Sequence, residues 1–411
     1  MRGVAPEPAP AYPQGLKAGR NRANVSGPAL FAGATRGEHP VMRATIERSA
    51  FLKALNHVQS VVERRNTIPI LSNVLVQAAG GQLKLTATDL DLEIVESAPA
   101  QVARDGATTV PAHMLYDIVR KLPDGAQLEL EQGPDHGRVS IFAGRSRFAL
   151  QALPPEDFPD LASGEMGNSF TIAASDLKGL IEKTRFAIST EETRYYLNGI
   201  YLHEAVNGTL LRAVATDGHR LAQAQIARPE GAKGMPGVIV PRKTVLEVVK
   251  LIEGLEEDVE VALSSTKIRF TAGKLVLTSK LIDGTFPDYE RVIPRHNDKV
   301  LDVDTRIFSD AVDRVSTISM EKGRAVKLNI APGKLMLTVN NPDSGSAEEE
   351  IACSYDSEPI DIGFNSRYLL DVAGQIKSAS MLFNLADAGS PTIIRDPGDE
   401  QALYVLMPMR V

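Results

Sequence analysis

The 411-residue sequence contains no tryptophan, a single cysteine (Cys353) and few aromatic residues, which make up 5% of the chain. A lone cysteine cannot build a disulfide framework, so a reducing, cytoplasmic setting is expected. No apolar run is long enough to span a bilayer. The seven histidines are scattered singly, and there is no phosphate-binding loop, metal-ligand spacing or nucleophile elbow. The sequence therefore predicts no membrane span, no metal site and no cofactor.

Residues 1–41 differ in composition from the rest of the chain. Ala, Gly and Pro supply 20 of these 41 residues, and apolar periodicity is absent. Such a composition cannot build a packed core, so a disordered or mis-assigned N-terminal extension is expected, with Met42 as the start of the folded part. The extension lacks a continuous apolar stretch, which argues against a secretory signal; a targeting segment that contains arginine and few acidic residues is the alternative.

The charge balance is acidic. The whole chain carries a formal charge of −7, and residues 42–411 contain 40 basic and 50 acidic residues. Net charge alone argues against a nucleic-acid partner.

Two phrases recur along the chain with nearly the same spacing. Ala-Thr-Asp stands at 87–89 and at 215–217, with a weaker echo in GKLMLTVNN at 333–341. The second phrase reads VPAHMLYDIV from 110, VPRKTVLEVV from 240 and GFNSRYLLDV from 363. Two independent phrases with one spacing indicate three domain-sized copies. We call them repeat 1 (42–162), repeat 2 (163–295) and repeat 3 (296–411).

Each repeat holds two stretches with apolar residues at i, i+3, i+4 and i+7, which predict helices with one buried face. The six stretches are 51–58, 115–122, 177–184, 245–252, 308–315 and 369–376, and Thr184 is the one polar lapse. Apolar residues alternate in 83–87, 259–263, 335–339 and 403–407, which predicts strands. The predicted fold class is α+β, with two helices packed on an antiparallel sheet in each repeat.

Asp217 and His219, two residues apart after a predicted strand, could suggest a catalytic pair. The same phrase in repeat 1 has Asp89 but no histidine after it, and repeat 3 has Asn341 at the corresponding position. A short side chain that hydrogen-bonds the backbone of a turn fits all three copies. The repetition therefore favours a structural role for Asp217.

Four motifs on this threefold repeat carry a specific resemblance: RYYLNG (194–199), ATDGHRL (215–221), FPDYERV (286–292) and YVLMPMRV (404–411). Together they resemble the bacterial sliding clamps, the beta subunits of DNA polymerase III, over 42–411. The resemblance implies the DNA-clamp fold, a head-to-tail homodimeric ring with helices lining a hole for double-stranded DNA and sheets outside. It also implies a non-catalytic processivity factor that tethers the replicative DNA polymerase.

The distribution of charge agrees with this resemblance. Basic residues concentrate on or beside the predicted helices, whereas acidic residues crowd strands and loops, as at 256–258 and 348–350. A positive lining lets an acidic protein hold DNA through its phosphates, independently of base sequence. Arg65 matches a DNA-contacting arginine of the family. The predicted DNA-binding residues are Arg64, Arg65, Arg120, Lys121, Arg242 and Lys243; a solvated helix face is the alternative for each.

Ring closure requires an interface between repeats 1 and 3 of different chains. The strand at 145–150 offers two arginines, and 348–350 offers three glutamates. Antiparallel pairing of these edges would set opposite charges face to face, with an apolar contribution. The predicted interface residues are Arg145, Arg147, Phe148, Ile318, Glu348, Glu349 and Glu350; two solvated edges are the alternative.

The resemblance also implies an apolar cleft between repeats 2 and 3 that binds short peptides of the replicative and repair DNA polymerases, the clamp loader and other clamp-binding proteins. Flexible methionines suit a cleft with several partners, although core filling by Met407 and Met409 is the alternative. The predicted cleft residues are Arg194, Tyr196, Leu197, Thr216, Gly218, His219, Arg220, Leu221, Pro287, Arg291, Val292, Asn365, Tyr368, Val405, Met407, Pro408, Met409 and Arg410.

Two other classes of function compete with a clamp. An enzyme could use only Asp217 with His219, and no nucleophile lies close to them in the sequence. A static scaffold would never encircle DNA. The topology of the DNA distinguishes these hypotheses, because a ring stays on circular DNA and slides off the ends of linear DNA.

Overall fold

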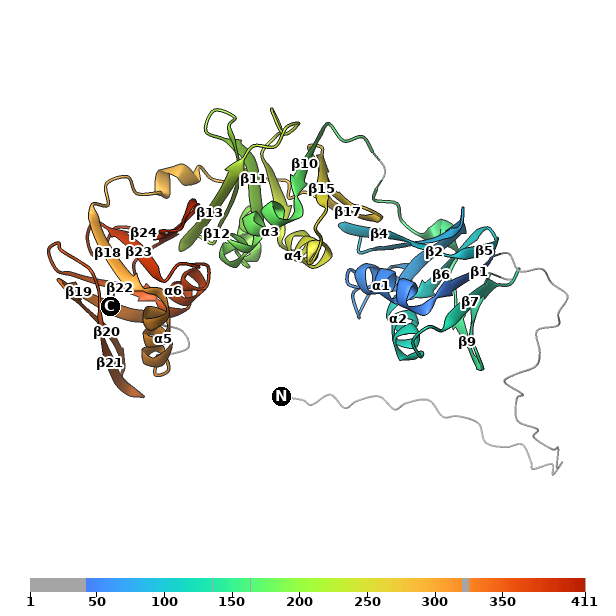
Figure 1. The fold of residues 1–411 in the computed structure, drawn as a ribbon, viewed down its shortest axis with the longest axis horizontal. Helices are drawn as coiled ribbons and strands as arrows, with labels where there is room; N and C mark the ends of the chain where they lie inside the picture. Colours follow the sequence, from blue (N-terminus) through green and yellow to red (C-terminus); the bar gives the residue numbers. More distant parts are fainter. Residues whose placement is uncertain (1–41, 135, 163, 320–324, 411) are drawn as a thin grey trace, which may run out of the picture. The chain divides into compact units, whose positions relative to one another are not determined.

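The computed structural model describes residues 42–134, 136–162, 164–319 and 325–410; the predicted extension, 1–41, lies outside them. Six α-helices occur in the described residues, two in each repeat, which confirms the predicted α+β class (Figure 1). They are α1 (Arg48–Val58), α2 (Ala112–Lys121), α3 (Ala174–Glu182), α4 (Arg242–Ile252), α5 (Thr305–Ser316) and α6 (Ser366–Ala373). Short 3-10 helices are η1 (Pro69–Ser72), η2 (Pro155–Asp157), η3 (Arg185–Ala187), η4 (Glu192–Leu197) and η5 (Tyr289–Val292).

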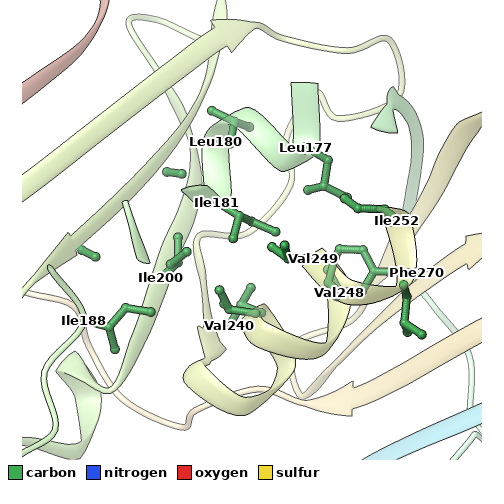
Figure 2. Close-up of a cluster of buried hydrophobic side chains, with 14 of the residues drawn as sticks. Leu177, Leu180, Ile181, Ile188, Ile200, Val240, Val248, Val249, Ile252 and Phe270 are labelled. Atoms are coloured by element: carbon green, nitrogen blue, oxygen red, sulfur yellow. The ribbon is translucent and has the colours of Figure 1, made fainter. Parts of the chain in front are cut away.

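Each helix buries the apolar face that its periodicity predicts, and the two helices of a repeat pack on each other. Figure 2 shows this core in repeat 2, where Leu177 and Ile181 of α3 meet Val249 and Ile252 of α4. The lapse at Thr184 is explained by its hydroxyl, which donates to the carbonyl oxygens of Leu180 and Ile181 at 2.7 and 3.3 Å. A polar side chain can be buried there because its hydrogen bonds are made within the last turn.

The strands form four antiparallel sheets. In order across each sheet, sheet 1 contains β5 (Gln101–Arg104), β1 (Met42–Glu47), β7 (Gln127–Gln132), β8 (Arg138–Ala143) and β9 (Ser146–Gln151). Sheet 2 contains β10 (Asn168–Ala173), β15 (Asp258–Leu263), β16 (Lys267–Ala272), β17 (Leu275–Lys280), β4 (Leu92–Pro99), β3 (Gln82–Thr88), β2 (Asn73–Ala79) and β6 (Gly106–Pro111). Sheet 3 contains β14 (Val238–Pro241), β11 (Gly199–Ala205), β12 (Leu210–Thr216), β13 (Arg220–Ala227), β25 (Asp399–Leu406), β24 (Thr392–Asp396), β23 (Ser380–Leu385) and β18 (Lys299–Asp304). Sheet 4 contains β21 (Gly345–Ala352), β20 (Lys334–Asn341), β19 (Ala325–Ala331) and β22 (Ile360–Asn365).

Two of these sheets run across repeat junctions, which the sequence patterns did not predict. At the first junction β4 of repeat 1 pairs with β17 of repeat 2, and at the second junction β13 of repeat 2 pairs with β25 of repeat 3. Sheets 1 and 4 each belong to one repeat and end in the edge strands β9 and β21. An edge strand leaves a row of backbone N–H and C=O groups without strand partners.

Sheet 3 is covered by apolar side chains on both faces. Along β13 and β25, Ala222, Tyr404 and Leu406 belong to the main core, whereas Leu221 and Val405 belong to a separate cluster. Successive strand residues point to opposite faces, so this separate cluster lies on the face away from the main core. We call it the outer cluster; its buried members are Leu197, Val214, Leu221, Ile239, Phe286, Tyr289, Ile393 and Val405.

The Ala-Thr-Asp phrase forms the same turn in repeats 1 and 2, and Asn341 makes a related backbone contact in repeat 3. Asp217 Oδ1 accepts hydrogen bonds from the backbone N–H groups of His219 and Arg220 at 2.9 and 3.1 Å. Asp89 Oδ1 accepts from the N–H groups two and three residues on, at 2.9 and 2.7 Å. Asn341 Oδ1 accepts from the N–H of Asp343 at 3.0 Å. The predicted structural role of these side chains is confirmed.

Candidate functional site

A pocket of about 290 Å³ lies beside the outer cluster at the second junction. Four segments line it: 194–197 in η4, 216–221 around the start of β13, 287–292 around η5, and 405–407 at the end of β25. The pocket brings together eleven of the predicted cleft residues: Arg194, Tyr196, Leu197, Thr216, Gly218, Arg220, Leu221, Pro287, Val292, Val405 and Met407. Met407 is 41% exposed at the pocket, so it does not fill the core.

Asp288 and Tyr289 also line the pocket, and the sequence reading missed both. The signal was present, because the two residues lie inside the motif FPDYERV between the predicted Pro287 and Arg291. Tyr289 is 6% exposed and belongs to the outer cluster, so it forms part of the pocket's buried wall.

The other seven predicted cleft residues do not line this pocket; they are His219, Arg291, Asn365, Tyr368, Pro408, Met409 and Arg410. Several of them have structural contacts. The carbonyl of His219 accepts a hydrogen bond from the N–H of Met407 at 2.9 Å, and the N–H of Met409 donates to the carbonyl of Gly363 at 2.8 Å. Asn365 caps α6 by accepting from the N–H of Arg367 at 3.0 Å. These contacts hold the C-terminal segment and α6 beside the pocket.

The turn at 217–219 has glycine at its centre, where the corresponding turn of repeat 1 has Leu90 at φ 81°. Gly218 has φ +89°, a conformation that other residues adopt at a cost. A Cβ atom there would lie 2.5 Å from the guanidinium of Arg194, which pairs with Glu191 at 2.7 Å. The hydrogen bond and charge of Glu191 raise the pKa of Arg194. Gly218 thus lets an arginine lie against the backbone at the pocket's polar edge.

Arg220 fastens repeat 2 to repeat 3. Its side chain donates to Asp217 at 3.1 Å, to the carbonyl of Phe186 at 2.6 Å and to Asp371 of α6. Its guanidinium lies 4.3 Å from the ring centroid of Tyr368, within range of a cation–π contact. Arg220 is 8% exposed, so these partners stabilise a charge that would be costly to bury alone.

Three outward-facing residues explain why a pocket forms at the second junction. Leu221 of β13 faces Val405 of β25, which faces Ile393 of β24. We call this set the second-junction triad. Each side chain is at most 4% exposed, and together they form an apolar base on the outer face of sheet 3.

The same strand positions at the first junction are polar. Glu93 of β4 faces Thr278 of β17, which faces Arg269 of β16; we call this set the first-junction triad. The chain itself covers these residues. The N–H of Leu161 donates to Glu93 at 3.2 Å, and Arg269 donates to the carbonyl of Ala162. Burial raises the pKa of Glu93. Leu161 and Ala162, at the end of repeat 1, therefore occupy the place that is open at the second junction.

The predicted DNA-binding residues lie on or next to helices, as expected, and they differ in their partners. Arg64, Arg65, Lys121 and Arg242 are exposed and form no salt bridge with the described residues, whereas Arg120 pairs with Asp117 at 3.0 Å. Lys243 is held between repeats, donating to Asp89 and, at 3.3 Å, to Glu63 of repeat 1. Burial lowers the pKa of Lys243, but its bonds and charge contacts with Asp89 and Glu63 outweigh burial and leave the pKa raised.

The predicted interface residues lie at the two sheet edges. Arg147 and Phe148 are in β9, with Arg145 in the turn before it, and the three glutamates are in β21. Glu349 points inward, where it accepts from Arg314 of α5 at 2.6 and 3.0 Å, and Glu350 pairs with Lys334 at 2.6 Å. Ile318 packs against the core of its own chain. Glu348 is exposed and forms no salt bridge with the described part of the chain.

Among the described residues, no group of three or more His, Cys, Asp or Glu side chains is arranged to hold a metal ion. No helix in that part of the chain is long and apolar enough to cross a membrane.

Known proteins resemble the chain over most of its length. Family models of the DNA polymerase III beta subunit match at 42–162 (N-terminal domain), 171–288 (central domain) and 290–410 (C-terminal domain). The beta sliding clamp of Caulobacter vibrioides is 57% identical over 372 residues, which are 90% of this chain and 100% of that protein. That of Escherichia coli is 41% identical over 373 residues, with the same coverage.

Solved clamp structures share the fold. A Bartonella birtlesii sliding clamp bound to griselimycin superimposes with a TM-score of 0.88 at 58% identity, covering 90% of this chain and 100% of that one. A Pseudomonas aeruginosa sliding clamp with a ligand has a TM-score of 0.86 at 42% identity, with the same coverage. With all three domain models matched in order, the chain belongs to the DNA polymerase III beta subunit family, the beta sliding clamps.

Proposed function

We propose that two copies of this chain join head to tail into a ring that encircles duplex DNA without regard to sequence. The ring tethers the replicative DNA polymerase, repair polymerases, the clamp loader and other proteins that carry short clamp-binding peptides. Members of this family are processivity factors, and the chain has no catalytic role. The observation that carries the proposal is the repeated pairing of strands across the junctions.

The pairing of strands across the junctions leaves two edge strands, β9 and β21, without a partner on one side. The last strand of repeat 2 (β17) pairs with β4, and the last strand of repeat 3 (β25) pairs with β13. β4 follows the Asp89 turn of repeat 1, and β13 follows the Asp217 turn of repeat 2. By the same rule β9, the last strand of repeat 1, would pair with β21, which follows the Asn341 turn of repeat 3. Both are edge strands, so a second copy of the chain completes both edges and closes a symmetric assembly.

The register of this pairing follows from the two junctions within the chain. In β21 the residue corresponding to Leu221 is Ser346. Leu221 faces Thr216, the residue before Asp217, and Ser346 faces Asn340, the residue before Asn341. In β9 the residue corresponding to Thr278 is Ala149, because the β8–β9 and β16–β17 hairpins have the same register. The scheme therefore pairs Ser346 with Ala149 of the partner subunit.

This register matches charges on the outward face. It sets Glu348 opposite Arg147 of the partner subunit and Glu350 opposite Arg145 of the partner subunit. On the inward face it sets Ala347 opposite Phe148 of the partner subunit, where the junctions within the chain pair Ile94 with Leu277 and Ala222 with Tyr404. Opposite charges across an antiparallel pair select the partner and fix the register.

Contacts to DNA are assigned to the exposed basic residues on and beside the helices. Arg64 and Arg65 lie in the loop after α1, Lys121 ends α2 and Arg242 begins α4. Side chains of this kind neutralise phosphates, which releases counterions and makes binding depend on salt. Lys243 is assigned a different role, because its ion pairs with repeat 1 already use its charge.

Arg65→Gln and Lys243→Gln are expected to affect DNA binding differently. Arg65→Gln should lower the slope of log affinity against log salt by about 1 per subunit, because one phosphate contact is lost. Lys243→Gln should leave that slope unchanged and instead lower thermal stability, because it leaves Asp89 without its cationic partner. Fluorescence titrations of duplex DNA at several salt concentrations would check this. Equal slopes for Arg65→Gln and the wild type would contradict the assignment of Arg65.

The pocket is assigned to the peptides of clamp-binding proteins. Its apolar lining and its two large, exposed hydrophobic members, Val292 and Met407, suit the side chains of a short linear segment. Griselimycin, to which the Bartonella relative is bound, would be tested for competition with these peptides. The domains are assigned to 42–162, 163–295 and 296–411, close to the ranges of the three matching domain models. A cytoplasmic location is inferred from the lone cysteine and from the family's place in replication.

Retention on DNA of defined topology tests the ring. The protein would be loaded by its clamp loader onto a nicked circle, separated by size, and separated again after the circle has been linearised. Elution with the circle followed by loss from the linear DNA is expected, because a ring slides off an end. Equal retention on both forms would replace the ring with ordinary phosphate binding, and absence from both would favour a scaffold.

A further inference from the structure

One wall of the pocket belongs to no sheet. Pro287, Tyr289 and Val292 come from the segment 281–298, which connects β17 of repeat 2 to β18 of repeat 3 and in which only η5 is regular. A segment outside a sheet is positioned by its side-chain contacts rather than by a ladder of backbone hydrogen bonds. The shape of this wall therefore depends on what holds Tyr289.

The hydroxyl of Tyr289 lies between two polar side chains of sheet 3. Arg212 Nη1 donates to the hydroxyl oxygen at 2.8 Å. His203 Nε2 lies 3.0 Å from the same oxygen, and His203 Nδ1 lies 2.8 Å from the carbonyl oxygen of Glu204. The carbonyl can only accept, so Nδ1 carries the proton and Nε2 accepts from the tyrosine hydroxyl. Every polar atom of this chain of hydrogen bonds is then satisfied with a neutral His203.

Both side chains are themselves held in place. Arg212 is 7% exposed and also donates to Gln225 at 3.0 and 3.1 Å and to Glu290 at 3.0 Å. The ring of Tyr201 stacks between His203, at a centroid distance of 4.5 Å, and Phe286, at 4.9 Å. Neither Arg212 nor His203 lines the pocket. They contact the wall from behind.

We propose that Arg212 and His203 are positioning residues that set the pocket's affinity for apolar peptide side chains by fixing Tyr289. The inference rests on the proposed function of the pocket as a peptide site. The Tyr289 hydroxyl is bonded internally, so it presents no unmet polar group to the pocket, and Asp288 in the same wall is paired with Arg291 at 2.6 Å. The site then favours aliphatic and aromatic side chains, whose burial against such a wall leaves no polar atom unpaired.

The arrangement requires a neutral His203. A protonated ring loses the acceptor for the Tyr289 hydroxyl and sets a second positive charge beside Arg212. The groups that face His203 are Tyr289, Tyr201, Arg212, Glu290 and the carbonyl of Glu204. Burial and the charge of Arg212 lower the pKa of His203 below its usual 6.5, against the opposing effects of the Glu204 carbonyl and Glu290. A group with a lowered pKa stays neutral at pH 7.5 and is protonated only as the pH falls through that lowered value, so affinity is lost on the acid side.

Peptide affinity measured against pH tests the proposal. The probe is a rhodamine-labelled, histidine-free peptide, chosen as the tightest binder among overlapping peptides of the cognate replicative polymerase, and binding is followed by anisotropy from pH 7.5 to 5.0. For the wild type, affinity should be constant near pH 7.5 and fall by about tenfold at the acid end, the effect of one unmet buried hydrogen bond. His203→Phe keeps a ring to stack on Tyr201 and cannot titrate, so its affinity should be lower at pH 7.5 and independent of pH. Tyr289→Phe should also remove the pH dependence.

His296→Gln is the matched control, because His296 is an exposed histidine of the same connecting segment. This variant should reproduce the wild-type pH profile. A His203→Phe variant that keeps the wild-type profile, or a wild type whose affinity does not change with pH, overturns the proposal and leaves the peptide site standing. A folded, dimeric wild type that binds none of the peptides at pH 7.5 overturns the peptide site itself.

Discussion

Arg147→Glu is expected to convert the dimer into a monomer. The inferred register sets Arg147 opposite Glu348 of the partner subunit at both interfaces of the ring, so the substitution places two glutamates face to face twice. Juxtaposed like charges cost several kcal/mol, which weakens dimerisation by roughly a hundredfold or more. Analytical ultracentrifugation across a concentration series would measure the change, and retention on nicked circles should fall with it.

The compensating exchange makes this test specific to the register. Glu348→Arg alone should also weaken the dimer, and the double variant Arg147→Glu with Glu348→Arg should recover much of the wild-type affinity, because the opposite charges are restored in exchanged positions. Arg104→Glu is the matched control, since Arg104 is an exposed arginine in β5 at the other edge of sheet 1. If the double variant is no better than the single ones, the proposed register is wrong even if the edges do pair.

Met407→Asp is expected to abolish stimulation of the polymerase and to leave the ring intact. Met407 is 41% exposed at the pocket, so the substitution removes little buried apolar surface and should cost little stability. In the complex, however, a carboxylate would be buried against the peptide without a partner. A central contact of this kind typically changes binding by 2 kcal/mol or more, about thirtyfold in affinity. Peptide anisotropy and primer extension with the cognate polymerase would measure the loss.

Val300→Asp is the control for this second prediction. Val300 is 42% exposed in β18, on the same sheet, and does not line the pocket. Both variants should keep the dimer mass and the retention on circles. Normal polymerase stimulation by Met407→Asp would remove the pocket as the tethering site, and equal losses in both variants would point to a general effect of added charge on sheet 3.

Local patterns in the sequence predicted the helices and the Asp turn, because both depend on residues close together in the chain. The face of α1 follows from the spacing of Phe51, Leu55 and Val58, and the role of Asp217 follows from its neighbours. The joining of sheets across the junctions was not predicted. The pairing of β13 with β25 depends on residues nearly two hundred positions apart, and neither strand carries a local sign of its partner.

The pocket likewise has features that local sequence patterns predicted and features that they did not. Motifs located Leu197, Leu221 and Met407, each within a distinctive phrase. Composition could not show that Lys243 is held by Asp89, or that Arg212 and His203 support Tyr289, because these contacts join residues from distant parts of the chain. Identical residue types can face DNA or a neighbouring carboxylate, and only the fold distinguishes the two.

If the pocket binds clients as proposed, the covered first junction also determines how many clients one ring can hold. The second-junction triad is apolar, whereas the first-junction triad contains Glu93 and Arg269 and is covered by Leu161 and Ala162. In the proposed register the corresponding set at the subunit junction is Ser346 with Ala149 and Ser140 of the partner subunit. A dimeric ring with three equivalent junctions per subunit would have six binding sites if all the junctions were open. With one open junction per subunit, its valency is two. Two binding sites allow a second client to stay bound to the same ring, at a high effective concentration, and to replace the first client when that one dissociates.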